Sequence, residues 1–114
     1  MAMDFDIQSY ESISNMLITG TSNNDIINIT YGDSITIESG AGDDYICIEC
    51  GTNVTIDSGD GDDLINNYFG YSYSINAGAG NDIIVNEDTQ VTIDAGLGDD
   101  SIRNQSWYTT MKAA

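Results

Sequence analysis

The chain has 114 residues, and its 19 acidic side chains outnumber the two basic ones, Arg103 and Lys112, so that the formal net charge is −17. This length allows one domain at most. The charge argues against nucleic acid and anionic membranes as partners and favours cations, while the absence of histidine removes the commonest general base and metal ligand.

The first segment, residues 1–17, mixes polar and apolar residues. It has neither the basic start nor the apolar core of a secretory signal. No apolar run in the chain approaches the roughly 18 residues of a membrane-spanning helix, so we expect no membrane span. We expect residues 1–17 to form an N-terminal cap, because an uncovered end of a repeat structure exposes core and unpaired backbone.

Residues 18–104 repeat one pattern, in which a short apolar run, a turn rich in glycine and aspartate, and a second apolar run follow each other. Val54–Ile65 (VTIDSGDGDDLI) is a clear copy, residues 35–46, 73–84 and 91–102 are three more, and residues 17–27 are a worn one. The first apolar run recurs at steps of 19, 19 and 18 residues, at Ile37, Ile56, Ile75 and Ile93. A fixed period of this size predicts a solenoid.

Both apolar runs are short, β-branched and bounded by Gly, Asn and Asp, which favours strand over helix. Two strands and two turns within 19 residues make one coil. We therefore predict an all-β fold, a parallel β-roll or β-helix solenoid of about five coils with 18–19 residues each. Residues 105–114 break the period and form a C-terminal cap or tail, in which Trp107 and Tyr108 are candidates to cover the last coil.

Alternation along the strands assigns the side chains to faces. The positions expected to point inward are Ile35, Ile37, Val54, Ile56, Tyr73, Ile75, Val91 and Ile93 on the first strand and Ile27, Ile46, Ile65, Ile84 and Ile102 on the second. Thr36, Thr55, Ser74 and Thr92 then point outward. Two residues after the second column, Asn67, Asn86 and Asn104 are expected to form an internal asparagine ladder.

One outward row of the second strand is apolar instead of polar. It contains Ile26, Tyr45, Leu64 and Ile83. Single exposed apolar residues are common, but a contiguous row is less so. This row is a candidate interface for self-association or for contact with a cell surface or another hydrophobic surface.

The turn motif Gly-x-Gly-(Asp/Asn)-Asp carries the chemistry. Its glycines bring carbonyl oxygens close, and its aspartates add carboxylate oxygens. Ca²⁺ takes six to eight oxygen ligands, more than one turn supplies, but two turns stacked one coil apart supply enough. Five stacked turns leave four gaps, which predicts about four Ca²⁺ ions between successive coils. Calcium is then expected to drive or complete folding, because it neutralises aspartates that repel one another.

The segment Ser39–Cys47 (SGAGDDYIC) resembles the nonapeptide G-G-x-G-x-D-x-U-x of the calcium-binding β-roll in repeats-in-toxin (hemolysin-type, RTX) proteins. The first glycine is replaced by Ser39, Ser58, Ala77 and Ala95 in the four clear copies. RTX repeats return every nine residues and place calcium along both edges, whereas this motif returns every 18 or 19. The resemblance therefore implies a roll with a single calcium edge, similar to the repeats of bacterial calcium-dependent adhesins and ice-binding proteins.

In the RTX family the aspartate at the sixth position of the motif is the side-chain ligand and turn carbonyls assist it. Carried over, that role falls on Asp44, Asp63, Asp82 and Asp100, and on Asp25 of the worn copy. The full set of candidate metal residues is Asp25, Gly40, Gly42, Asp43, Asp44, Gly59, Gly61, Asp62, Asp63, Gly78, Gly80, Asn81, Asp82, Gly96, Gly98, Asp99 and Asp100.

Other interpretations of the motifs carry less weight. Ice binding would need a regular Thr and Asn row beside the turns, and only Thr21 and Asn24 fit it. The Cys47-x-x-Cys50 pair does not start a helix, so a local disulfide or two inert thiols are expected in place of redox chemistry. The aromatic cluster Tyr68, Phe69, Tyr71 and Tyr73 is expected to pack over the solenoid edge, with binding of sugar rings or of another surface as the alternative.

No catalytic residues emerge, so we do not expect an enzyme. The function predicted from the sequence is a calcium-binding structural or adhesive module of an extracellular bacterial protein, secreted or at the cell surface. The alternative is a surface-active, amphiphilic or self-associating protein that uses the apolar row, and ice binding ranks below both.

Overall fold

The protein is built from β-strands, and the computed structural model describes residues 5–87, 89–105 and 109–113. Within these residues there is no helix with the length and apolar character needed to cross a membrane. The eight strands are β1 (Phe5–Thr19), β2 (Asn24–Glu38), β3 (Tyr45–Asp57), β4 (Leu64–Asn76), β5 (Ile83–Asn86), β6 (Thr89–Gly96), β7 (Ser101–Asn104) and β8 (Thr109–Ala113).

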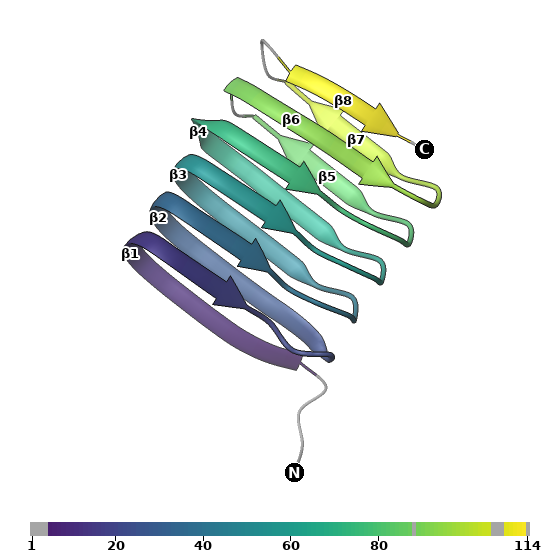
Figure 1. Ribbon diagram of the computed structural model, residues 1–114, viewed down its shortest axis with the longest axis horizontal. Coiled ribbons are helices and arrows are strands. Elements are labelled where there is room, and N and C mark those ends of the chain that lie inside the picture. Colours follow the sequence, from purple (N-terminus) through teal and green to yellow (C-terminus); the bar gives the residue numbers. More distant parts are fainter. Residues whose placement is uncertain (1–4, 88, 106–108, 114) are drawn as a thin grey trace.

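All pairings between these strands are parallel, and the strands stack as a flattened solenoid with extents of 45 × 33 × 17 Å (Figure 1). The register advances by 19 residues per coil, as in Ile27 opposite Ile46, and by 18 near the C-terminal end, as in Ile75 opposite Ile93. The predicted all-β parallel solenoid with about five turns of this period is confirmed.

The two edges of the solenoid turn the chain in different ways (Figure 1). At the edge formed by the glycine–aspartate motifs, which we call the aspartate edge, one strand ends and the next begins. At the opposite edge the ladder continues through the bend, so that β2, β3 and β4 each contain both segments that the sequence predicts as separate strands. Backbone pairing therefore holds the second edge, where Gly32, Gly51 and Gly70 stand in register and no aspartate motif occurs.

One residue in each bend of this second edge leaves the ladder with a left-handed backbone. These residues are Asn15 (φ 51°), Ser34 (57°), Asn53 (53°), Ser72 (64°) and Gln90 (55°), and they define what we call the bare edge. A single left-handed residue changes the chain direction within an otherwise extended strand. Because Ser and Gln rarely adopt this conformation, their identities alone do not predict it.

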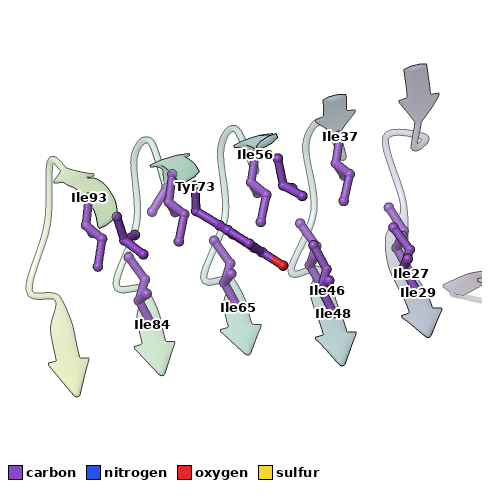
Figure 2. Packing of buried hydrophobic residues seen from close by; sticks show 14 of the residues in the cluster. Ile27, Ile29, Ile37, Ile46, Ile48, Ile56, Ile65, Tyr73, Ile84 and Ile93 are labelled. Carbon is purple, nitrogen blue, oxygen red and sulfur yellow. The ribbon is translucent and has the colours of Figure 1, made fainter. Parts of the chain in front are cut away.

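Columns of isoleucine fill the interior between the two sheet layers (Figure 2). Ile27, Ile46, Ile65 and Ile84 are fully buried in one layer, and Ile37, Ile56, Ile75 and Ile93 face them from the other. The predicted inward positions are buried throughout, except that Ile102 is only partly buried. Burial of each such side chain stabilises the fold by about 1.5–3 kcal/mol, which makes the columns the main source of stability.

Tyr73 is a fully enclosed aromatic side chain among the aliphatic columns, whereas Tyr10, in register with Ile29, is only partly buried. Tyr73 is 3% exposed and stands in register with Val54 and Val91, and its ring reaches toward the preceding coil (Figure 2). A Cβ atom on Gly51 would lie 2.1 Å from the Tyr73 hydroxyl oxygen. Gly51 therefore leaves the space that this ring occupies.

The other members of the predicted aromatic cluster do not pack over the edge in the same way. Phe69 is 69% exposed and Tyr71 is 52% exposed, while Tyr68 is half-buried. The expectation that the cluster covers the edge is wrong for Phe69 and Tyr71. Their rings lie outside the interior, which the isoleucine columns and Tyr73 fill.

The asparagine column forms only part of the predicted ladder. Asn86 is fully buried and donates from Nδ2 to Oδ1 of Asn104 at 2.8 Å. Asn67, one coil earlier, is also fully buried, but neither its Nδ2 nor its Oδ1 has a hydrogen-bond partner among the described residues. Asn67 follows Ile29 and Ile48 in the same column, so an amide stands where earlier coils place an alkyl group.

The two ends of the predicted roll also have strand structure. Phe5–Thr19 forms β1, which pairs in register with β2, and Thr109–Ala113 forms β8, which pairs with β6. The division of the chain at residues 17 and 104 into caps and roll stays a prediction. Trp107 and Tyr108, expected to cover the last coil, lie outside the described residues.

Candidate metal centre

The glycines of the aspartate edge are required by both backbone conformation and space. Gly61 has φ of 120°, a conformation that residues with a side chain rarely adopt. A Cβ atom there would lie 2.0 Å from the carbonyl oxygen of Gly42, one coil before. The same arrangement recurs at the other clear copies, so backbone carbonyl oxygens of one turn face the next turn at close range.

The second aspartate of each motif forms a ladder along the solenoid. The carboxylate Oδ1 of Asp44 accepts from the amide of Asp25 at 2.8 Å, and that of Asp63 accepts from the amide of Asp44 at 2.8 Å. The series continues with Asp82 and Asp100 at 2.8 and 2.9 Å. Each carboxylate thus reaches back one coil, and one of its two oxygens is used in doing so.

The other oxygen of these carboxylates is left without a hydrogen bond. Oδ2 is buried and has no partner among the described residues in Asp44, Asp63, Asp82 and Asp100. The first three side chains are at most 2% exposed. A buried anionic oxygen without a partner is unfavourable, so four of them at the same place in successive coils require an explanation.

Burial changes the acidity of this row. Loss of solvent raises the pKa of Asp44 to about 6 and that of Asp63 to about 7, against the lowering effects of the amide that donates to each carboxylate and of the nearby Ser39 and Ser58 hydroxyls, which themselves donate to backbone carbonyls. Charges of neighbouring aspartates raise both further. Burial likewise raises the pKa of Asp82. Ionisation of these carboxylates is therefore unfavourable when no positive charge neutralises them.

The first acidic position of each motif forms a second ladder, which runs in the opposite direction. The Oδ1 of Asp43 accepts from the amide of Asp62 at 2.8 Å, and that of Asp62 accepts from the amide of Asn81 at 2.7 Å. Asn24 precedes them and Asp99 follows them in the same row. These side chains are exposed. Asn serves as well as Asp here, because the oxygen that accepts is common to both.

The residue in place of the first motif glycine points into the interior. Ser39 and Ser58 are fully buried, and their hydroxyl groups donate to the carbonyl oxygens of Ser58 and Ala77 at 3.0 and 2.8 Å. Ala77 and Ala95 are also fully buried. This departure from the RTX pattern therefore has a packing reason, since a small side chain fits here and a hydroxyl gains a partner one coil on.

The worn copy differs from the clear copies at its aspartate. Asp25 is 1% exposed, but its Oδ2 accepts from the Thr21 amide at 2.8 Å and its Oδ1 from the Thr21 hydroxyl at 3.1 Å. Asp25 therefore satisfies its carboxylate within its own turn. The structure separates it from Asp44, Asp63, Asp82 and Asp100, with which the sequence groups it.

The ligand atoms available at the aspartate edge restrict which metal ion could bind there. Among residues 5–87, 89–105 and 109–113, no three His, Cys, Asp or Glu side chains form a group that could hold a metal ion. A cation at this edge would need backbone carbonyl oxygens in addition to the Oδ2 atoms. Some of these carbonyls already accept hydrogen bonds, such as Gly59 from Ala79 at 3.1 Å and Gly78 from Leu97 at 2.9 Å. The set fits a hard cation with oxygen ligands and does not fit a zinc site.

The predicted apolar row is one register row of the sheet, on the half of each coil that follows the aspartate edge. Ile26, Tyr45, Leu64 and Ile83 lie opposite one another in turn, and the row ends at Ser101. Ile7 of β1 extends it by one coil and is 57% exposed, a member that the repeat pattern does not reveal because the worn copy starts after it. We call these five apolar residues the apolar stripe.

The two cysteines are free thiols, so the alternative of a local disulfide is not realised. Burial raises the pKa of the Cys47 thiol, which makes it unreactive at neutral pH.

No protein-family model matches the chain, and comparisons with curated proteins and with solved structures give no match either. The interpretation of the aspartate edge therefore depends on its own geometry.

Proposed function

We propose that the protein is a calcium-binding β-roll in which Ca²⁺ ions between successive turns of the aspartate edge complete the fold. It acts as a structural or adhesive module of an extracellular bacterial protein. The single observation that supports this most is the row of four buried carboxylate oxygens without hydrogen-bond partners, on Asp44, Asp63, Asp82 and Asp100. A hard divalent cation is the partner that such oxygens prefer.

Charge supports the same proposal. About four Ca²⁺ ions, one for each gap between motif turns, would bring +8 and leave about −9 of the formal −17. Bound calcium would supply positive charge at the place where burial makes the aspartates hardest to ionise. Extracellular calcium is near the millimolar range in which modules of this kind bind, which favours a secreted or cell-surface location.

The test compares two aspartates that differ in their place on the coil. Asp63→Asn removes one charge from the buried row but keeps the Oδ1 that accepts from the Asp44 amide. Asp57→Asn removes the same charge from an exposed position outside the motif. We expect Asp63→Asn to lose one or two bound Ca²⁺ ions in titration calorimetry and Asp57→Asn to keep them all. Equal binding by both variants would contradict the proposal.

A second candidate function is surface activity or self-association through the apolar stripe. Its support is the exposure of the stripe ends, 57% at Ile7 and 49% at Ile83, in one continuous row. Light scattering of Leu64→Asp and Ile83→Asp tests it, with Thr55→Asp on the opposite layer as the control for added charge. We expect the first two variants to be smaller in solution than the wild type. Identical monomers in all cases would remove this candidate.

A further inference from the structure

A groove lies next to the bare edge, away from the glycine–aspartate turns. It has a volume of about 550 Å³ and is lined by Thr30, Tyr31, Glu49, Cys50, Tyr68 and Phe69. Three successive coils contribute two adjacent residues each, so the groove crosses β2, β3 and β4. Neither the calcium proposal nor the apolar stripe uses any of these side chains.

Two aromatic side chains stand at the ends of one row in this groove. Tyr31, Cys50 and Phe69 lie opposite one another on three consecutive coils. Tyr31 is 45% exposed and Phe69 is 69% exposed, while Cys50 between them is small and half-buried. The two aromatic residues are therefore about 9.6 Å apart along the stack, twice the inter-strand spacing, with open space above the thiol.

The parallel row supplies negative charge. The paired neighbours on both sides place Glu49 between Thr30 and Tyr68, and the hydrogen bond from the Glu87 amide to the Asn67 carbonyl places Glu87 one coil beyond Tyr68. The neighbouring Cys47, partial burial, Tyr45 and the Glu87 and Glu49 carboxylates all raise the pKa of the Tyr68 phenol. The raised pKa keeps the Cys47 thiol uncharged at neutral pH, so the negative charge of this row comes from carboxylates: Glu49 and Glu87, with Glu11 of β1 beside Thr30.

We propose that this groove binds a small organic cation with a methylated ammonium group. A cation midway between Tyr31 and Phe69 would be about 4.8 Å from each residue along the stack, inside the roughly 6 Å over which aromatic rings attract cations. Glu49 offers it a carboxylate on the middle coil, and the net charge of −17 attracts cations to the whole surface. A sugar ring also stacks on aromatic residues, but it gains nothing from the charge.

The experiment compares choline with its uncharged isostere 3,3-dimethylbutan-1-ol. Both are titrated into the full chain at saturating calcium and fixed ionic strength, with detection by ¹H–¹⁵N NMR. We expect choline to shift the amide signals of Tyr31, Cys50 and Phe69 and the isostere to bind at least about ten-fold more weakly. Equal binding of both compounds, binding of neither, or shifts confined to other residues would overturn the proposal, as would tighter binding of methyl glucoside than of choline.

Three variants locate the effect. Glu49→Gln keeps the shape of the groove, and we expect it to weaken choline binding about five-fold, whereas Glu38→Gln, which removes a charge from the exposed end of β2, leaves it unchanged. Cys50→Leu fills the space between the aromatic residues and should abolish binding. Since Phe69 is largely exposed, Phe69→Ala should leave the core intact. We expect this variant to bind choline more weakly, and unfolding would not explain that loss of affinity. Unchanged choline affinity in Glu49→Gln and Phe69→Ala would contradict the assignment.

Discussion

The two edges of this solenoid reverse the same chain with the same period but by different means. The aspartate edge interrupts the strands, requires glycine, and buries carboxylate oxygens that have no hydrogen-bond partner within the described part of the chain. The bare edge keeps both segments of a coil within one strand in β2, β3 and β4, and it uses one left-handed Asn, Ser or Gln per coil together with a short glycine row, Gly32, Gly51 and Gly70. Both edges therefore constrain the backbone, but in the residues that the structure describes only the aspartate edge carries a row of buried carboxylate oxygens without hydrogen-bond partners, and this difference indicates a ligand.

The largest difference between the edges should appear when alanine is placed in each bend. Gly61→Ala introduces a Cβ atom 2.0 Å from the Gly42 carbonyl oxygen at φ of 120°. We expect it to lower the free energy of unfolding by about 3 kcal/mol or more. Asn53→Ala places alanine in a left-handed backbone conformation, with φ of 53°, and we expect it to lower the free energy of unfolding by only about 1 kcal/mol.

Urea unfolding at saturating calcium measures both values. Similar losses for the two variants would show that the close approach of neighbouring turns at the aspartate edge does not constrain the sequence.

Acidification should sharpen the comparison next. The folded state raises the pKa of Asp44 to about 6 and of Asp63 to about 7, against 3.8 in the unfolded chain, so the folded protein binds more protons within this window. The metal-free protein should therefore be more stable at pH 5 than at pH 8, since stability falls as pH rises through the folded pKa values.

Thermal melts in calcium-free buffer check this sign. Asp63→Asn should raise the melting temperature of the metal-free protein at pH 8 and reduce its pH dependence. A metal-free protein that melts at a higher temperature at pH 8 than at pH 5 would contradict the account.

A smaller change in stability should distinguish the buried Asn67 amide, for which we propose no ligand, from the buried aspartate carboxylates, for which we propose calcium. Asn67 lies in the core, and neither its amide nitrogen nor its amide oxygen has a hydrogen-bond partner in the part of the chain that the structure describes. Ile29 and Ile48 occupy the same column. We expect Asn67→Val to stabilise the protein by about 1 kcal/mol, because an apolar group replaces an unsatisfied one.

This gain should be the same with and without calcium, in contrast to changes in the aspartate row. Denaturant unfolding under both conditions measures it, and a loss of stability would indicate that the Asn67 amide has a role in packing.

Much of this architecture is predictable from the sequence because the repeat is strong. The period, the buried columns and the row that contains Leu64 follow from alternation and from the steps between Ile37, Ile56 and Ile75. The bare edge is less predictable, because Ser34 and Gln90 carry no signal for a left-handed bend.

Details that arise between coils also escape a reading of one repeat. The use of Gly51 to make room for Tyr73 depends on a contact between two coils, which one repeat does not contain. The hydrogen bonds by which Thr21 satisfies Asp25 form within one turn, but they belong to the worn copy, whose residues depart from the repeat. The groove beside Cys50 is of the same kind, since three coils create it and no single motif marks it.

The stoichiometry of calcium binding tests the central claim most directly. Native mass spectrometry and titration calorimetry on the 114-residue chain should find about four bound Ca²⁺ ions. In calcium the β-type circular dichroism signal should be stronger, and the protein should melt at a higher temperature, than in EDTA. If the chain binds no calcium, or if its spectrum and melting temperature are the same in EDTA and in millimolar calcium, the buried carboxylate row is not a calcium edge.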